Sequence, residues 1–326
     1  VTMHILEFGH LGTDDFQTNL TRLHHLPAAD IHFIQSEEHL HPIPEGKIII
    51  DAILGSGINR EVEGITASLI NHMNASGAEI VSIDIPSGLF VDTSSKEIKT
   101  VKANHTLSFQ CYKMALLIPE NSASIGEVHI LDIGLHNDFY KKVELKSEII
   151  DKEIIQSIYK PRNKFAHKGN FGHVLLIAGS YGKIGAAVLS AKACLRSGAG
   201  LLTSHIPKCG YAILQSTVPE AMVVTDLNTE LISKVETDIE KYSAIGIGPG
   251  IGTEATTKLM LKELLTSCKK AVVLDADALN IISEVKELMQ LIPEGSILTP
   301  HPKEFERLFG KSNNDFERIQ LAVDKA

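Results

Sequence analysis

The stretch HKGNFGHVLLIAGSYGKIGAAVLSAKACLRSGAGLLT, residues 167–203, decides the fold class. It contains an apolar run, HVLLIA, then a glycine-rich turn, and then a helical pattern lined with small residues. An apolar run without polar alternation is typical of a strand that is buried on both faces of a parallel sheet. The stretch therefore predicts a strand that leads into a closely packed helix of an α/β domain.

The same arrangement recurs along the chain. Five further apolar runs end in glycine, aspartate or proline before a helical pattern: KIIIDAILGSG (47–57), EIVSIDIPSG (79–88), YSAIGIGPG (242–250), KAVVLDADALN (270–280) and SILTPHP (296–302). Helical patterns include residues 65–75, 186–198 and 254–267. The expected fold class is α/β with three-layer domains, in which ligands bind beyond the carboxyl ends of the strands.

Length and composition set the limits of this reading. The 326 residues suffice for two domains, and the formal net charge of −9 argues against a nucleic-acid surface or an anionic-membrane patch. No run reaches the roughly 18 apolar residues of a membrane span. The scattered cysteines fit reduced thiols in a cytoplasmic protein. The charged stretch 136–170 interrupts the apolar runs, so we expect domains at 1–150 and 151–326.

Two expected strand ends in the first half carry carboxylates. Asp51 precedes a Gly-Ser-Gly turn, and Asp84 lies between two isoleucines. Burying an unpaired carboxylate is costly, so each needs a partner or a chemical role. With the hydroxyl of Ser87, they would offer oxygen ligands for a hard cation and a base for proton abstraction. The spacing leaves open which carboxylate has which role, and Asp84 could instead cap the next turn.

The glycine-rich turns of both halves have two readings each. The glycines of the Gly55–Gly57 turn would allow positive φ and close approach of a phosphate, or only chain reversal. In the second half, Ile184 stands where a Walker A loop needs Ser or Thr, so that motif is rejected. Gly185 could open the helix start for a ligand or serve the turn alone. The run GIGPGIG (246–252) is typical of a phosphate or ribose contact.

Polar residues also follow the last two expected strands. Strand alternation would put Asp275 and Asp277 on the same face, where one could organise a metal–phosphate site and the other could cap a helix. His301 stands between Pro300 and Pro302, at the point where the apolar run SILT is followed by a helical pattern. The sequence supports equally a role in a turn and a role in a functional site. Glu304 is expected in the first helical turn, where a negative charge is favourable.

Together these segments resemble the bifunctional NAD(P)H-hydrate repair enzymes. The matching motifs are DAILGSGINR, DIPSG and ANHTLSF in the first half, and HKGNFG, PEAMV, GPGIG, LDADALN and TPHPKEF in the second. The resemblance covers nearly the whole chain. It implies a Rossmann-like NAD(P)H-hydrate epimerase domain over 1–150, truncated at its N-terminus. A ribokinase-like, ADP/ATP-dependent NAD(P)H-hydrate dehydratase domain, truncated at its C-terminus, would follow over 151–326.

The resemblance also implies roles for matching residues of the first half. Asp51 and Ser87 would be ligands of a K⁺ ion. Asp84 would be the catalytic acid or base for epimerisation of the R and S hydrates of NADH and NADPH. The substrate contacts would be Asp84 itself and the loop of Gly55, Ser56, Gly57, Ile58, Asn59, Arg60 and Glu61.

In the second half, Ala186, Gly250 and His301 would contact the S hydrate. ADP or ATP with Mg²⁺ would phosphorylate the added hydroxyl, and loss of phosphate would restore the dihydronicotinamide ring. Phosphorylation makes hydroxide a good leaving group, which is why a kinase-like fold suits a dehydration. By the same resemblance we expect a cytoplasmic homo-oligomer.

Two departures from the family pattern limit this assignment. A loop Asn-Asn-Gly-Gly-Asp would lie upstream of Val1, and a loop Gly-Ser/Thr-Gly-Asp with the dehydratase base would lie beyond Ala326. We therefore expect an interior fragment whose two active sites are incomplete. The alternatives are a ribokinase-like kinase of a small hydroxymethyl heterocycle, which leaves the DAILGSGINR and DIPSG motifs unexplained, and a non-catalytic nucleotide-binding module.

Overall fold

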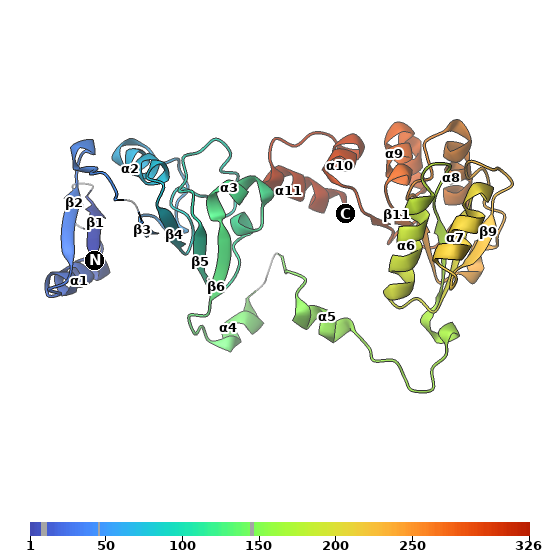
Figure 1. The fold of residues 1–326 in the computed structure, drawn as a ribbon, viewed down its shortest axis with the longest axis horizontal. Helices are drawn as coiled ribbons and strands as arrows, with labels where there is room; N and C mark the ends of the chain where they lie inside the picture. The colour runs from blue at the N-terminus through green and yellow to red at the C-terminus, as the bar shows by residue number, and fades with distance from the viewer. Residues whose placement is uncertain (8–11, 45, 144–146) are drawn as a thin grey trace. The chain divides into compact units, whose positions relative to one another are not determined.

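The structure is a computed structural model that describes residues 1–7, 12–44, 46–143 and 147–326 (Figure 1). The chain forms two compact units. Unit 1 comprises Val1–Ser147 and Ser312–Ala326, and unit 2 comprises Glu148–Lys311. Every strand pairing is parallel, which confirms the expected α/β class with parallel sheets.

The strands of unit 1 form two sheets. A two-stranded sheet pairs β1 with β2, and a four-stranded sheet has the order β3-β4-β5-β6. The strands are β1 (Thr2–Leu6), β2 (Asp30–Ile34), β3 (Ile48–Asp51), β4 (Glu79–Ile83), β5 (His105–Phe109) and β6 (Glu127–Leu131). The α-helices in this part of the chain are α1 (Asp14–His24), α2 (Gly64–Ala75), α3 (Ser122–Ile125) and α4 (Asn137–Lys142), and the 3₁₀ helices are η1 (Glu37–His39), η2 (Met114–Leu116) and η3 (Pro119–Asn121).

Helix α2 anchors the larger sheet of unit 1. Its sequence repeats apolar residues every three or four positions, so that one stripe is buried against the sheet. The buried stripe packs with Ile80 of β4 and with Ile34 at the end of β2. A second apolar cluster forms beyond the end of β4 around Ile85 and Leu89. Both clusters hold the carboxyl ends of β3 and β4 in place.

The last helix, α11 (Asp315–Lys325), belongs to unit 1, whereas the sequence placed residues 312–326 in the second domain. Glu120 and Asp315 exchange hydrogen bonds, each backbone N–H donating to the carboxylate of the other residue at 3.1 and 2.8 Å. Phe316 packs against the cluster of Ile85 and Leu89. The domain boundary expected after residue 150 lies three residues from the division after Ser147.

Unit 2 is built on one parallel sheet in the order β12-β11-β10-β7-β8-β9. Its strands are β7 (His173–Ile177), β8 (Leu201–Ile206), β9 (Met222–Thr225), β10 (Ala244–Ile247), β11 (Val273–Leu274) and β12 (Ile297–Leu298). Its α-helices are α5 (Lys152–Ile158), α6 (Ile184–Arg196), α7 (Tyr211–Thr217), α8 (Ala255–Ser267), α9 (Asp277–Glu284) and α10 (Pro302–Phe309), and its 3₁₀ helices are η4 (Lys168–Phe171), η5 (Lys208–Gly210), η6 (Ile239–Lys241) and η7 (Lys286–Leu291).

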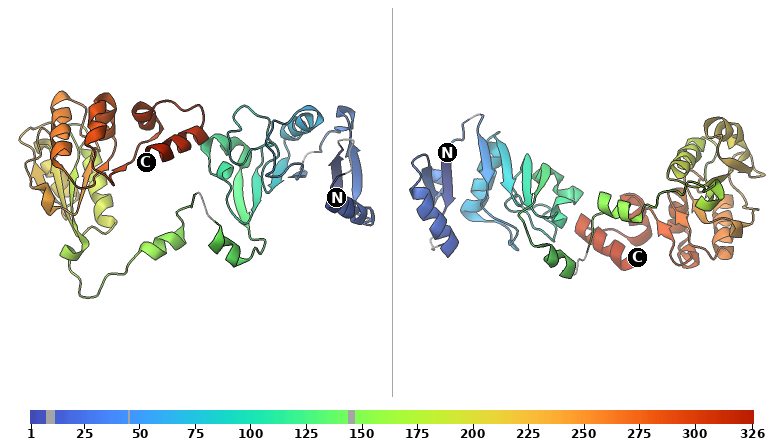
Figure 2. Two further views of the ribbon diagram at one scale, coloured as in Figure 1. Left: turned by 180° about the vertical axis from the view of Figure 1, so that it is seen from behind. Right: turned by 90° about the horizontal axis from the view of Figure 1, so that it is seen from below.

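Helices cover both faces of the unit 2 sheet, which gives it three layers (Figures 1 and 2). Successive residues of β7 point to opposite faces. Leu175 and Ile177 pack into the core beneath α8 and α9, whereas Leu176 and Ala178 pack beneath α6 and α7. Burial on both faces explains why the strands read as unbroken apolar runs.

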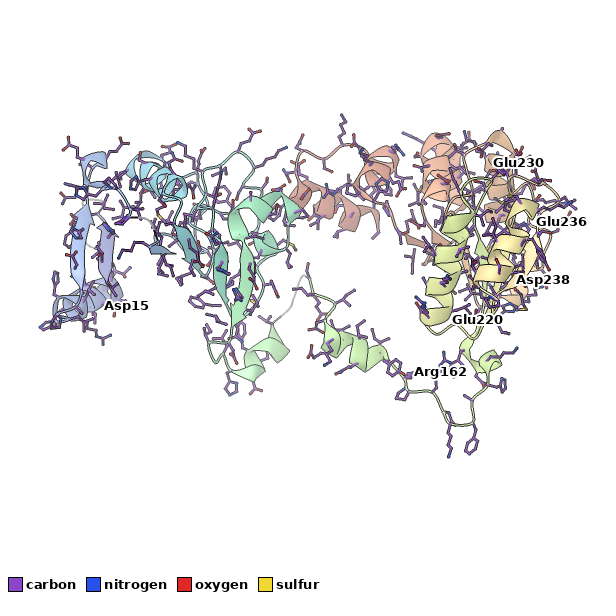
Figure 3. The ribbon with its side chains drawn as sticks, in the orientation of Figure 1. Asp15, Arg162, Glu220, Glu230, Glu236 and Asp238 are labelled. Atoms are coloured by element: carbon purple, nitrogen blue, oxygen red, sulfur yellow. The ribbon has the colours of Figure 1, made fainter. Side chains whose placement is uncertain are left out.

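The charged stretch 136–170 spans the division between the two units and holds short helices and no described strand, as the sequence indicates. Residues 144–146 of this stretch lie outside the described residues. Arg162, labelled in Figure 3, donates to the carbonyl of Gly198 at 2.9 Å, and its guanidinium lies 4.2 Å from the ring centroid of Phe171. Nowhere in the described ranges is a helix both long and apolar enough to cross a membrane.

Candidate functional site

The carboxyl ends of β3 and β4 meet at Asp51. This carboxylate is 1% exposed and accepts hydrogen bonds from the Ser82 hydroxyl at 2.7 Å, the Ser87 hydroxyl at 2.6 Å and the Ser87 N–H at 2.9 Å. The register pairs Asp51 with Ser82, which explains the first of these contacts. The structure thus brings together Asp51 and Ser87, which the sequence proposed as ligands of one cation. It also satisfies the buried charge with protein donors.

Asp84 follows β4 and has a positive φ of 69°, which is uncommon for a residue other than glycine. Its Oδ1 lies 2.5 Å from the Lys113 Nζ and accepts from the Phe109 N–H at 3.1 Å. Lys113 also donates to the Ser108 hydroxyl and the Phe109 carbonyl, at 2.8 and 2.9 Å. All three ammonium donors are therefore used, and they fix the position of the Asp84 carboxylate.

Two cavities adjoin these strand ends. A cavity of about 270 Å³ is lined by Ala52, Leu54, Gly55, Ser56, Ile83, Asp84 and Phe109. Asp84 is the one carboxylate of that lining. A larger cavity of about 490 Å³ is lined by Leu54, Ile58, Arg60, Glu61, Val62, Glu63 and Thr66. The expected substrate loop thus contributes to both cavities, although neither lining includes Gly57 or Asn59.

The expected backbone role of the Gly55–Gly57 turn is not observed. Neither glycine has a positive φ, and a Cβ added to either would meet no atom within 4 Å. Their conformations are open to other residues, so chain geometry does not require glycine here. Because glycine has no side chain, these two positions leave open space beside the cavities.

In unit 2, Ala186 and Gly250 lie next to each other. Gly250 has a φ of 69°, and a Cβ at this position would lie 3.0 Å from the Ala186 Cβ and 3.0 Å from the Lys183 carbonyl oxygen. The Ser180 hydroxyl donates to the Gly250 carbonyl at 2.7 Å. Two of the three expected contacts to the S hydrate therefore meet, at the carboxyl ends of β7 and β10.

Asp275 and Asp277 do not share one environment, contrary to the strand-alternation expectation. The intervening Ala276 has a φ of 48°, which ends the strand geometry. Asp277 begins α9 and contacts the Lys183 Nζ at 3.2 Å and the Gly252 N–H at 2.8 Å. Asp275 accepts from the Thr299 hydroxyl at 2.8 Å. Asp277 therefore ties the glycine-rich loop to the start of α6.

His301 is the N-cap of α10. Its Nδ1 accepts from the Lys303 N–H at 3.2 Å, while the Glu304 carboxylate accepts from the His301 N–H at 3.0 Å, which forms a capping box. Glu304 is confirmed in the first helical turn. Among the described residues, no hydrogen bond or ion pair joins His301 to Ala186 or Gly250. Its Nε2 lies 3.3 Å from the buried Glu304 Oε1, and the side chain as a whole is 58% exposed.

Sequence reasoning did not single out two residues of the unit 1 site. Ser82 was readable from strand alternation, since it lies two residues before Asp84 and opposite Asp51 in a parallel register. Lys113 had no local signal, because it lies 29 residues after Asp84 and beyond the next strand. Only the three-dimensional pairing identifies it as the partner of Asp84.

The fold and the strand-end clusters define an α/β protein of two units, each with its candidate site residues at the carboxyl ends of parallel strands. Two family models match it: YjeF-related protein N-terminus over residues 1–115, and NAD(P)H-hydrate dehydratase over residues 174–325. Curated bifunctional NAD(P)H-hydrate repair enzymes are similar to it, at 35% identity for Coxiella burnetii and 31% for Escherichia coli, each over 85% of this chain. The two halves of the chain thus match two different family models, each over its own residues.

The chain spans about half the length of these curated relatives, 56% and 52% respectively. Among solved structures, the ADP/ATP-dependent NAD(P)H-hydrate dehydratase from Bacillus subtilis, co-crystallised with ATP and Mg²⁺, is 27% identical. That match has a TM-score of 0.43 and covers 56% of this chain and 61% of that chain.

Proposed function

We propose that the protein repairs hydrated nicotinamide nucleotides, with unit 1 interconverting the R and S hydrates of NADH and NADPH and unit 2 dehydrating the S hydrate. The observation that carries the proposal is the cavity at the end of β4, whose lining holds a single carboxylate, Asp84, fixed by Lys113. The proposed cytoplasmic location and homo-oligomeric state follow from the family alone.

Epimerisation requires proton transfer at the hydroxyl of the hydrated carbon. If that hydroxyl leaves as water and water adds again from the other face, the carbon is inverted, and each step moves one proton at oxygen. Asp84 is the group that would carry this proton, since a carboxylate within hydrogen-bond reach is a common acid–base catalyst. Lys113 holds Oδ1, so in this proposal the other oxygen of Asp84 would meet the substrate.

The proposed K⁺ ligands Asp51 and Ser87 have the hard oxygen atoms that such a cation prefers. The contacts to Ile53, Ser82 and Ser87 occupy the four acceptor positions of the Asp51 carboxylate. A cation must therefore displace at least one protein donor. The Ser87 hydroxyl can give way, because it also reaches the Leu54 carbonyl at 3.2 Å. A bound K⁺ would supply positive charge at the strand end beside the cavity.

In unit 2, the space above Gly250 and Ala186 would receive the hydrated ring, and the loop that follows β10 would approach the phosphates of ADP or ATP with Mg²⁺. Small residues support this placement because any side chain at Gly250 would fill the space next to Ala186. His301 would bind the hydrate through its Nε2, in place of the contact with Glu304 Oε1, while its Nδ1 caps α10.

Chromatography of the hydrate epimers tests the role of unit 1. Purified R hydrate of NADH is incubated with the protein that contains this chain, and appearance of the S hydrate is measured against buffer alone. Asp84→Asn is expected to reduce the epimerisation rate by about 100-fold or more, and the exposed Asp92→Asn is the matched control. Equal rates for both variants would remove Asp84 from the proposed catalytic role.

Recovery of dihydronicotinamide absorbance from the S hydrate, with ADP or ATP and Mg²⁺, tests the role of unit 2 in the protein that contains this chain. His301→Asn retains an N-cap acceptor but removes the imidazole. A raised KM with an unchanged unfolding temperature supports hydrate binding by His301, whereas unchanged kinetics leave it as a cap alone. Phosphorylation of a heterocyclic alcohol without hydrate turnover would favour the kinase alternative.

A further inference from the structure

Three side chains with metal-ligand chemistry meet at the amino ends of β5 and β6. His105 opens β5, Glu127 opens β6, and His129 lies two residues further along β6. The register pairs His105 with Glu127, and residues two apart share a face of the sheet. The potential ligand atoms of the three residues all lie within 4.8 Å of one another. In the part of the chain that the structure describes, this is the one such group.

The spacing of the two imidazoles suits a tetrahedral ion. His105 Nδ1 and His129 Nε2 are 3.2 Å apart, and Zn–N bonds of about 2.05 Å at a tetrahedral angle require about 3.3 Å. The Glu127 carboxylate offers Oε2 at 3.8 Å from His105 Nδ1 and Oε1 at 3.9 Å from His129 Nε2. A rotation of this exposed side chain that brings one oxygen toward both nitrogens would complete a three-ligand set.

The second nitrogen of His105 faces another carboxylate. Its Nε2 lies 3.6 Å from Glu79 Oε1. Metal-bound histidines usually direct their other N–H to a carboxylate, which fixes the tautomer and the ring orientation. With the proton on Nε2, His105 presents the lone pair of Nδ1 toward His129 and Glu127.

The backbone holds the ligand-bearing residues in register. Asn104 precedes His105, donates its N–H to the Ile80 carbonyl at 2.7 Å and accepts the Ile80 N–H on its side chain at 2.8 Å. The Glu127 N–H donates to the Asn104 carbonyl at 2.8 Å. Gly126 has a φ of 55°, and a Cβ there would lie only 2.1 Å from that carbonyl oxygen. The starts of β4, β5 and β6 are thus fixed around the cluster.

We propose that His105, His129 and Glu127 bind a divalent transition-metal ion of the zinc class, with Glu79 as the positioning residue for His105. Two imidazoles and one carboxylate favour zinc, cobalt, nickel or copper over magnesium or calcium. Three protein ligands leave at least one coordination position for water. The site lies at the amino edge of the sheet, whereas Asp51 and Asp84 lie at its carboxyl edge, so the ion is separate from the proposed repair chemistry.

Titration of the chelator-treated full chain with Co²⁺ tests the proposal, because tetrahedral Co²⁺ has strong visible absorption. One Co²⁺ per chain is expected, with displacement by Zn²⁺. His129→Ala should weaken Co²⁺ binding by more than about 100-fold, and Glu79→Gln by about 10-fold. His32→Ala is the matched control, since His32 stacks on His4 with ring centroids 5.4 Å apart and has no such set of ligands.

Two results would overturn the proposal. One is absence of stoichiometric Co²⁺ absorption by the unsubstituted chain. The other is equal Co²⁺ binding by His129→Ala and His32→Ala, which would mean that any exposed histidine pair suffices. Far-UV circular dichroism of each variant verifies that the fold is retained, and His129 is exposed enough for its replacement to be tolerated.

Discussion

The strand ends of unit 1 and unit 2 differ in their residue types: unit 1 has hydrogen-bonded carboxylates, and unit 2 has small residues. At the ends of β3 and β4, buried charges are held by several hydrogen-bond donors, as in the contacts of Asp51 with Ser82 and Ser87. At the ends of β7 and β10, small residues leave room, as in the pair Ala186 and Gly250. The first arrangement fixes chemical groups, and the second creates space. The two sites should therefore respond to opposite kinds of substitution. The unit 1 site should lose stability when a side chain is shortened, and the unit 2 site when a side chain is added.

The largest expected effect is from removal of the Asp51 carboxylate. Asp51→Ala leaves the hydroxyls of Ser82 and Ser87 and the Ser87 N–H without their buried acceptor, so we expect unit 1 to lose about 3–5 kcal/mol of unfolding free energy. Urea denaturation measured by circular dichroism gives the loss, and hydrogen exchange of peptides from β3 and β4 assigns it to unit 1.

Ser82→Ala is the control for Asp51→Ala. It removes one donor and leaves the carboxylate with its other partners, so about 1 kcal/mol is expected. Equal losses in the two variants would mean that the carboxylate is not the centre of the network.

The next largest loss of stability is expected when one methyl group is added in unit 2. Gly250 and Gly182 both have positive φ, 69° and 78°, but a Cβ at Gly182 would meet no atom within 4 Å. Gly182→Ala should cost about 1 kcal/mol from backbone strain, and Gly250→Ala about 2–3 kcal/mol because crowding against Ala186 and Lys183 is added. Thermal unfolding of both variants measures the difference, and similar costs would show that the site tolerates filling.

The third effect is a pH dependence of stability. It comes from a buried histidine of unit 2, where a titratable side chain takes the place of the small residues. His205 is 2% exposed, and its Nε2 lies 3.7 Å from the Asp226 carboxylate. Burial lowers the pKa of His205 below 6.5, although Asp226 acts in the opposite direction. Burial alone would raise the pKa of Asp226, but hydrogen bonds from the N–H groups of Asn228, Lys234 and Ser233 outweigh it and hold this pKa below its usual value.

The sign of the pH dependence follows from these pKa values. Below pH 6.5 the unfolded chain binds a proton at His205 that the folded chain excludes, so stability decreases as the pH falls, by up to about 1.4 kcal/mol per pH unit. His205→Gln should remove this part of the slope in urea unfolding between pH 7 and about pH 5. Ser204→Ala, at the neighbouring buried position, should keep the slope. An unchanged slope in His205→Gln would exclude His205 as its source.

The smallest effect concerns the capping box of α10. Glu304→Ala removes the carboxylate that accepts the His301 N–H, so we expect a loss of about 1 kcal/mol. Glu306→Ala in the same helix should cost less than about 0.5 kcal/mol, because Glu306 has only an exposed contact to Lys311 at 3.8 Å. Equal thermal stabilities of the two variants would contradict a capping role of Glu304.

The features that depend on local sequence pattern could be predicted from the sequence. Unbroken apolar runs indicated the parallel strands, and the order of apolar runs and polar strand ends placed Asp51, Asp84 and Gly250 at the carboxyl edges. The parallel register then brings Asp51 near Ser87, and β7 near β10. These features depend on neighbours in sequence or on a general rule of parallel sheets.

Long-range pairing could not be predicted in the same way. Lys113 reaches Asp84 from beyond β5, and α11 joins unit 1 after the whole of unit 2. Backbone conformation was also missed, since Ala276 separates the environments of Asp275 and Asp277 and the Gly55–Gly57 turn does not use positive φ. The roles of Asp84, Ala186, Gly250 and His301 stay predictions.

The hydrogen bonds between Glu120 and Asp315 have a consequence during protein synthesis. The two residues are 195 positions apart, so at a translation rate of 5–20 residues per second Glu120 waits about 10–40 s for its partner. For that time the apolar cluster of Ile85 and Leu89 lacks the cover of Phe316, while unit 2 is made. Nascent unit 1 is therefore a candidate chaperone client until α11 emerges from the ribosome.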